Sequence, residues 1–444
     1  MSLSARFRAF AAPFLAVGEE GAVIQRNVGW LAADRVFRLA VGTVLNVWMI
    51  RYLGAQQLGL FSFAQSVVGI LAILSQLGLE TILVRDLVRR PDETREILGS
   101  ALGLRLAGAA ATFALSVATI ALLRPDNRTA LALAMVFASI YFFLALDVVE
   151  SWFQSRTRVA PYVVARSVAF VLSSIAKTWA LIAGAPIVVL AMTMAGEYVL
   201  AAVGLALAYR RQGDAPAGWC WRPAVASQLL RDAWPLVLNG AAVMLSIRID
   251  QAMLTLMRSE HENGIYAAAQ RLTEILFFIP VAFMNAAAPA LLRSHRRDRA
   301  EYDRRLQRVF FVLTWTAVGI ALPVSLLARP IVTTLFGPEF ADSGPVLALH
   351  IWSAPALFMG VGISNWFIAE ERQRDLMVRS IIAAAANVAL NLWLIPAFGA
   401  RGAALATLAA QTLAYWLANA AFAPTRGLFR LQCRALLRGT PRRD

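Results

Sequence analysis

The chain has 444 residues, of which 59% are hydrophobic and only 16% are charged, and its formal net charge is +15 at pH 7. Soluble domains average about 45–50% apolar and about 25% charged residues, so this composition excludes a soluble protein and indicates a polytopic membrane protein. In a soluble chain such a charge would suggest nucleic acid, but here the basic residues must be placed relative to a membrane, and no nucleic-acid partner is expected.

Apolar stretches punctuated by charged residues, glycine and proline recur along the whole chain. About 20 predominantly apolar residues cross a bilayer core, so these stretches predict an all-α fold of membrane-spanning helices. Very short connections at Gly184–Pro186 and Phe398–Ala400 predict two tight helical hairpins. The twelve predicted spans are 28–50, 58–82, 97–123, 129–151, 160–183, 186–209, 232–256, 264–291, 309–328, 344–369, 376–396 and 399–421.

The 42 basic residues are unevenly divided between the two sides of these predicted spans. Most lie in the N-terminus, in the loops after even-numbered spans and in the tail, whereas few lie in the alternate loops. The positive-inside rule therefore predicts that both termini are cytoplasmic, with an amphipathic N-terminal segment at 1–27 and a basic tail at 422–444. The arginines between 293 and 308 are expected to face anionic lipid headgroups.

An internal repeat divides the chain into halves. Gly59-Leu-Phe-Ser-Phe-Ala-Gln65 opens the second span, and Gly264-Ile-Tyr-Ala-Ala-Ala-Gln270 opens the eighth. Arg166-Ser167 and Arg379-Ser380 begin the fifth and eleventh spans in the same order. Duplicated halves are common in transporters. The repeat predicts six-helix lobes at 28–209 and 232–421, joined by a cytoplasmic linker at 210–231.

Several bases lie inside the predicted spans, where a charge is costly and usually faces a bundle interior or a water-filled cavity. Because the guanidinium group matches phosphate bidentately, a cavity lined by such bases suits a phosphate or pyrophosphate ligand. Arg105, Arg166 and Arg379 lie near predicted cytoplasmic ends and could instead reach the interface. The bases expected to bind substrate are Arg35, Arg38, Lys177, Arg248 and Arg271.

The acids inside the predicted spans have two possible roles, in structural ion pairs or in coupling to an ion. Arg271 and Glu274 lie one helical turn apart and could form a structural ion pair, and Asp34 could neutralise Arg38 in the same way. Glu197 and Asp250 have no such partner on their own helix, which favours a role in coupling to an ion. The candidates for ion coupling, with H⁺ or Na⁺ as the ion, are Asp250, Glu197, Glu274 and Asp34.

Motifs of enzymes and of metal sites are missing from the sequence. There is no P-loop, no GxSxG elbow and no Cys/His metal spacing, and the two cysteines, Cys220 and Cys433, indicate neither a disulfide nor a metal site. We therefore expect neither a catalytic centre nor a cofactor. A transport function remains, with the coupling ion as the only small partner besides the substrate.

Short motifs resemble a known family. Tyr52-Leu-Gly54 with Gly59-Leu-Phe61, and Leu77-Gly-Leu79 running to Arg85, are similar to the opening of the polysaccharide transporter branch of the MATE/MOP superfamily. The similarity continues in Gly264-Ile-Tyr266 and at Arg379-Ser380. This resemblance implies a V-shaped fold of twelve helices in two lobes. It also implies flipping of an undecaprenyl-pyrophosphate-linked oligosaccharide across the bacterial inner membrane, as O-antigen and exopolysaccharide flippases do, with proton or sodium antiport.

Three other functions would require different features of the sequence. A MATE-like exporter of drugs or other small molecules should show a cavity dominated by acids, whereas the deep residues here are mostly bases. The lipid II flippases of the same superfamily also resemble the chain, but they usually have two additional C-terminal helices. A polymerase or ligase of a glycan assembly pathway is expected as a partner rather than as the identity of this chain, because every outside loop is short.

Overall fold

The computed structural model describes residues 19–212 and 218–437, with side chains from residue 37 onward in the first helix. All of the regular structure in these ranges is helical. The first half of the chain contains α2 (Glu19–Leu71), α3 (Ile73–Gln76), α4 (Glu80–Arg89), α5 (Thr94–Leu123), α6 (Arg128–Leu144), α7 (Val148–Ser155), α8 (Ala160–Ile182) and α9 (Ile187–Arg210).

The second half of the chain continues the same pattern of long helices joined by short connections. Its helices are α10 (Pro223–Met257), α11 (Glu260–Ile275), α12 (Phe278–Arg297), α13 (Arg299–Leu326), α14 (Ala328–Phe336), α15 (Ser343–His350), α16 (Ser353–Ala369), α17 (Gln373–Phe398), α18 (Ala400–Thr412), α19 (Ala418–Ala421) and α20 (Arg426–Leu437). The predicted hairpins are confirmed, since α8 turns into α9 and α17 turns into α18 at the expected glycines.

Ten helical stretches in the described part of the chain are long and apolar enough to cross a membrane, which establishes a multi-pass membrane protein. The sequence predicted twelve spans. One stretch, Phe37–Arg89, includes the second predicted span and part of the first, because α2 continues through a kink at Gly54 (φ 68°, ψ 174°), a backbone conformation that glycine adopts readily. The predicted span at 399–421 is divided by a π-helical turn, Leu413–Leu417, into pieces that are too short to count.

Two predicted segment boundaries differ from the structure. Helix α10 begins at Pro223, inside the predicted linker 210–231, because proline is favoured in the first helical turn. Its first turns bind the first half of the chain, where Arg222 donates to Glu96 at 2.5 Å. Helix α2 already begins at Glu19, inside the predicted N-terminal segment. Residues 1–18, 213–217 and 438–444 lie outside the described residues.

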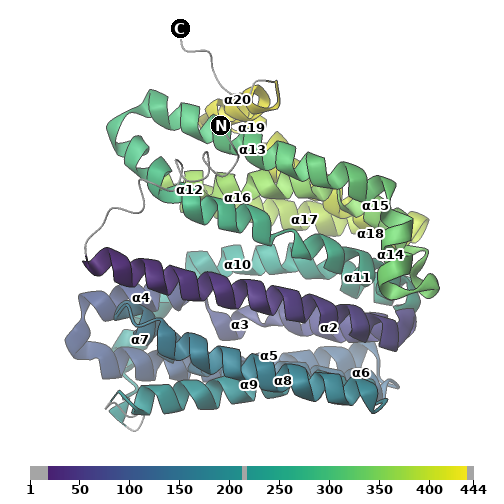
Figure 1. Ribbon diagram of the computed structural model, residues 1–444, viewed down its shortest axis with the longest axis horizontal. Coiled ribbons are helices and arrows are strands. Elements are labelled where there is room, and N and C mark those ends of the chain that lie inside the picture. Colours follow the sequence, from purple (N-terminus) through teal and green to yellow (C-terminus); the bar gives the residue numbers. More distant parts are fainter. Residues whose placement is uncertain (1–18, 213–217, 438–444) are drawn as a thin grey trace.

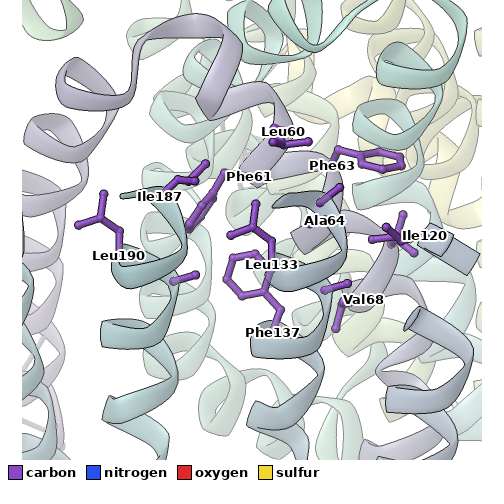
Figure 2. Close-up of a cluster of buried hydrophobic side chains, with 14 of the residues drawn as sticks. Leu60, Phe61, Phe63, Ala64, Val68, Ile120, Leu133, Phe137, Ile187 and Leu190 are labelled. Atoms are coloured by element: carbon purple, nitrogen blue, oxygen red, sulfur yellow. The ribbon is translucent and has the colours of Figure 1, made fainter. Parts of the chain in front are cut away.

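The long helices run side by side, and the two halves of the chain occupy opposite sides of the molecule (Figure 1). Helices α2, α10 and α11 lie between them, where α2 packs against both α10 and α11. Each half has its own apolar clusters. In the first half, Phe61, Leu133 and Phe137 are buried among residues of α2, α5, α6 and α9 (Figure 2). Rigid packing on both sides therefore positions the residues at the α2–α11 interface.

Candidate functional site: a basic cavity between the two halves

A cavity of about 250 Å³ lies between α2 and α11. The two sides of this cavity come from parts of the chain more than 200 residues apart, so only the tertiary fold creates it. Three charged residues line it, one from the first half and two from the second, among apolar and small polar side chains. The lining residues are Arg38, Leu39, Gly42, Thr43, Asn46, Val47 and Ile50 of α2, Arg271, Leu272, Glu274 and Ile275 of α11, and Phe336 of α14.

On the second-half side, two arginines share one carboxylate. Arg248 Nη1 lies 3.8 Å from one oxygen of Glu274, and Arg271 Nη1 lies 3.9 Å from the other. These separations exceed the hydrogen-bond range of about 2.7–3.2 Å. Arg271 Nη2 donates to Gln65 of α2 at 2.5 Å. Arg271 and Glu274 do form the ion pair considered from the sequence, but Arg248 adds a second base, so this side keeps a net positive charge.

On the first-half side, a carboxylate from α9 contacts a base from α2. Arg38 Nη1 lies 3.4 Å from Glu197, and the Arg38 guanidinium stacks 5.0 Å from the ring centre of Phe170. The half-buried Lys177 of α8 interacts electrostatically with both Glu197 and Arg271. Glu197 therefore contacts the basic cavity through Arg38, a partner on another helix that lies 159 residues away in the sequence.

Most of the predicted substrate ligands thus lie in one region. Arg38 and Arg271 line the cavity, Arg248 shares Glu274 with Arg271, and Lys177 interacts with Arg271. The side chains of Asp34 and Arg35 lie outside the described residues, so the predicted contributions of Asp34 and Arg35 stay predictions. In chemical terms, bases here outnumber the carboxylates Glu197 and Glu274. Such a cavity can hold a ligand with more than one negative charge.

Asp250 occupies a different site, buried inside the second half at 1% exposure. One carboxylate oxygen accepts from Asn391 Nδ2 at 2.5 Å, and the other accepts from the Tyr266 hydroxyl at 2.7 Å and from Thr407. All of these donors are neutral. Asn391 Oδ1 is buried beside this carboxylate and has no hydrogen-bond partner in the described structure. Arg248 and Asp250, two residues apart on α10, have separate partners, since Arg248 pairs with Glu274 whereas Asp250 accepts from Tyr266 and Thr407.

The Asp250 cluster combines the groups that bind a proton or a small hard cation. An ionised carboxylate is costly to bury unless a proton or a positive charge compensates it. Carboxylate, amide and hydroxyl oxygens are the ligands preferred by hard cations. The sequence prediction included Asp250 but missed Tyr266, Asn391 and Thr407 as partners. The spacing of Asn387 and Asn391, one turn apart in an apolar helix, was the available signal.

Beyond the cavity, at the end where Gly54 interrupts α2, the halves are closely packed. A Cβ atom on Gly59 would lie 1.7 Å from the Glu260 carbonyl oxygen, and one on Gly264 would lie 1.7 Å from the Ala55 carbonyl oxygen. Asn263 Nδ2 also donates to the Gly59 carbonyl at 2.8 Å. The two copies of the predicted repeat therefore face each other.

Two of the bases near predicted cytoplasmic ends are buried in the protein. They therefore do not reach the membrane–water interface, which the sequence left open. Arg105 is 4% exposed and Arg379 is 6% exposed. Arg379 of α17 instead donates to Thr425 at 2.7 Å and to the Ala418 carbonyl at 3.3 Å. These bonds connect α17 to α19 and to the residues that follow it. Arg166 is paired with Asp147 and Glu150 at 2.9 and 2.7 Å. These bases support the fold and do not line the basic cavity.

Comparison with known proteins agrees with this architecture. A family model described as Polysaccharide biosynthesis protein matches residues 24–295, and one described as MatE matches residues 235–393. Together with the fold, these matches place the chain in the MATE/MOP superfamily of membrane proteins. Because the first match covers more than half of the chain, the chain belongs to the Polysaccharide biosynthesis protein family.

Curated relatives match only part of the chain. It is 25% identical over 174 residues to "Probable flippase AglR" of Haloferax volcanii, and 28% identical over 205 residues to "Probable lipid II flippase MurJ" of Rhizobium tropici. These matches cover 38% and 43% of this chain, and 36% of each relative. The chain therefore spans about a third of the length of the curated relatives that it matches.

Solved structures match nearly the whole chain. The lipid II flippase MurJ in an inward closed conformation gives a TM-score of 0.69 at 14% identity, covering 91% of this chain and 90% of that one. An inward-facing multidrug resistance MATE family transporter gives 0.67 at 12% identity, covering 93% and 98%. At these identities the likeness establishes the fold alone.

Proposed function

We propose that this chain is a flippase that moves an undecaprenyl-pyrophosphate-linked oligosaccharide from the cytoplasmic to the periplasmic leaflet of the bacterial inner membrane. The oligosaccharide would be an O-antigen or exopolysaccharide repeat unit. The basic cavity between the halves carries this proposal, because its arginines suit pyrophosphate. Family membership and the flippase names of both curated relatives support it.

Transport would proceed by alternating access. Twelve spans in two six-helix lobes, at 28–209 and 232–421 with both termini cytoplasmic, would rock about the basic cavity. The close contact of Gly59 and Gly264 would separate to release the substrate on the periplasmic side. A polymerase or ligase of the glycan pathway would then receive the sugar.

Ion coupling would use the Asp250 cluster. A carboxylate buried among neutral donors must gain a proton or a cation, and Asn391 Oδ1 is a free oxygen beside it. Helices α10, α17 and α18 all contribute to this cluster, so binding of H⁺ or Na⁺ there would change the packing of the second half. Glu197 and Glu274 are less suited to this role because both contact arginines of the basic cavity.

A lipid II flippase would use the same pyrophosphate chemistry. The identity of the lipid-linked sugar must therefore be tested directly. A multidrug exporter is disfavoured by the charge of the cavity, since an organic cation would meet Arg38 and Arg271. These alternatives predict different phenotypes in a deletion strain. Loss of a repeat-unit flippase changes the surface glycan and accumulates its lipid-linked intermediate, whereas loss of an exporter changes drug resistance.

The test is complementation of that strain with the double variant Arg248→Gln and Arg271→Gln. Loss of two charge-assisted contacts should lower substrate affinity by roughly 100-fold or more and abolish surface glycan, while membrane insertion is unchanged. The matched control is Arg308→Gln, which removes an exposed arginine outside the cavity and should complement fully. Normal glycan export by the double variant would refute the proposal.

A further inference from the structure

A second hollow lies next to the basic cavity, on the lipid-facing side of the first half. It is an apolar groove of about 360 Å³ between α2 and α8. Aromatic and branched aliphatic side chains dominate its lining, and Ser174 and Thr178 are its only hydroxyl-bearing members among the described residues. The lining residues are Phe37, Val41 and Leu45 of α2, and Phe170, Val171, Ser174, Ile175, Thr178, Trp179 and Ile182 of α8.

The groove adjoins the basic cavity at one end. Phe37 and Phe170 pack edge to face there, with ring centres 5.9 Å apart. Arg38, the residue next to Phe37, lines the basic cavity and stacks on the same Phe170 ring at 5.0 Å. An amphiphile whose phosphate contacts Arg38 would therefore place its first apolar carbons against Phe170, at the start of the groove.

The dimensions and the lining of the groove match one branched hydrocarbon chain. Along α8 it extends from Phe170 to Ile182, which is about 18 Å at 1.5 Å per residue, more than half of a bilayer core of about 30 Å. Val171, Ile175 and Ile182 project at one-turn and two-turn spacings of about 5.4 and 11 Å. One turn is comparable to the length of an isoprene unit, so a methyl-branched chain can fit between these side chains.

We propose that the α2–α8 groove binds the polyprenyl chain of the carrier lipid while the basic cavity holds its pyrophosphate. This inference rests on the proposed function, and it places the chain along one half of the protein instead of in bulk lipid between the halves. By the predicted orientation, the groove runs from the depth of Arg38 toward the periplasmic face, so the chain stays in contact with protein while the headgroup crosses.

The test uses the full chain in nanodiscs and a polyprenyl diphosphate that carries a benzophenone on its chain. Photolabelling should fall on residues 170–182, and unlabelled polyprenyl diphosphate should compete about tenfold better than phosphatidylglycerol. Val171→Trp, which fills the groove, should lower this labelling about tenfold. The control is Val203→Trp, an exposed valine of α9 outside the groove (52% exposure, against 38% for Val171), which should leave the labelling unchanged.

The possible outcomes separate this inference from the proposed function. Equal competition by phosphatidylglycerol, or labelling that is unaffected by Val171→Trp, would mean that the groove holds ordinary lipid, and would overturn the inference. The flippase proposal would stand in that case if free pyrophosphate still competed with the lipid headgroup for the basic cavity, and if this competition depended on Arg271. If Val171→Trp does not fold, Ser174→Phe blocks the same groove from a half-buried position and gives the same readout.

Discussion

Two polar regions of this molecule lie at membrane depth, and they treat charge in opposite ways. At the basic cavity, the paired side chains Arg38, Glu197, Arg248, Arg271 and Glu274 are 22–28% exposed, and their ion pairs are 3.4–3.9 Å long. At Asp250, a carboxylate with 1% exposure is bonded at close range by neutral donors. Loose pairs in a partly open space can exchange partners with a ligand, whereas a buried and tightly bonded carboxylate leaves room for a proton or a small ion only, which is the role proposed for Asp250.

The largest expected effect comes from removing the ionisable group at Asp250. Asp250→Asn keeps the shape of the side chain but removes its ability to ionise, so ion-driven transport should fall at least about 100-fold. Burying an amide is cheaper than burying a carboxylate, so the melting temperature should stay the same or rise by a few degrees. Transport into proteoliposomes under imposed H⁺ and Na⁺ gradients, with melting followed by tryptophan fluorescence, measures both quantities. Gradient-dependent transport in this variant would exclude Asp250 as the coupling residue.

An intermediate effect with the opposite sign is expected at the basic cavity. Glu274→Gln removes the carboxylate shared by Arg248 and Arg271, which frees both guanidinium groups for an anion. Affinity for inorganic pyrophosphate should rise about tenfold at low ionic strength, and the gain should shrink as salt is added. Isothermal titration calorimetry of the purified protein measures this change. Weaker binding would instead show that Glu274 positions the two arginines.

The smallest effect isolates one ligand of Asp250. Thr407→Val removes a hydroxyl that donates to the carboxylate and keeps nearly the same volume. Tyr266 and Asn391 still donate to the carboxylate, so loss of this one hydrogen bond costs about 0.5–1.5 kcal/mol, and the apparent affinity for the coupling ion should fall roughly 2- to 10-fold. Pyrophosphate affinity should not change, because Thr407 does not line the basic cavity. Parallel changes in both affinities would mean that the two regions are one site.

Local patterns in the sequence predicted the helices, their hairpins and most of the deep bases, because hydropathy and turn residues act over short distances. Pairings across helices were harder to predict. Arg38 meets Glu197 across 159 residues and Asp250 meets Thr407 across 157, and no periodicity encodes either contact. The extension of α10 to Pro223 was also missed, since its polar first turns look like a linker until Glu96 is known to bind Arg222.

The contact between Gly59 and Gly264 determines how the two halves can separate and which residues they tolerate there. At these two glycines the seam is backbone against backbone, so its separation breaks the hydrogen bond from Asn263 to the Gly59 carbonyl but requires no bulky side chain to withdraw. A larger residue at Gly59 or at Gly264 would collide with the backbone of the opposite half, so a replacement at either glycine affects both halves at once.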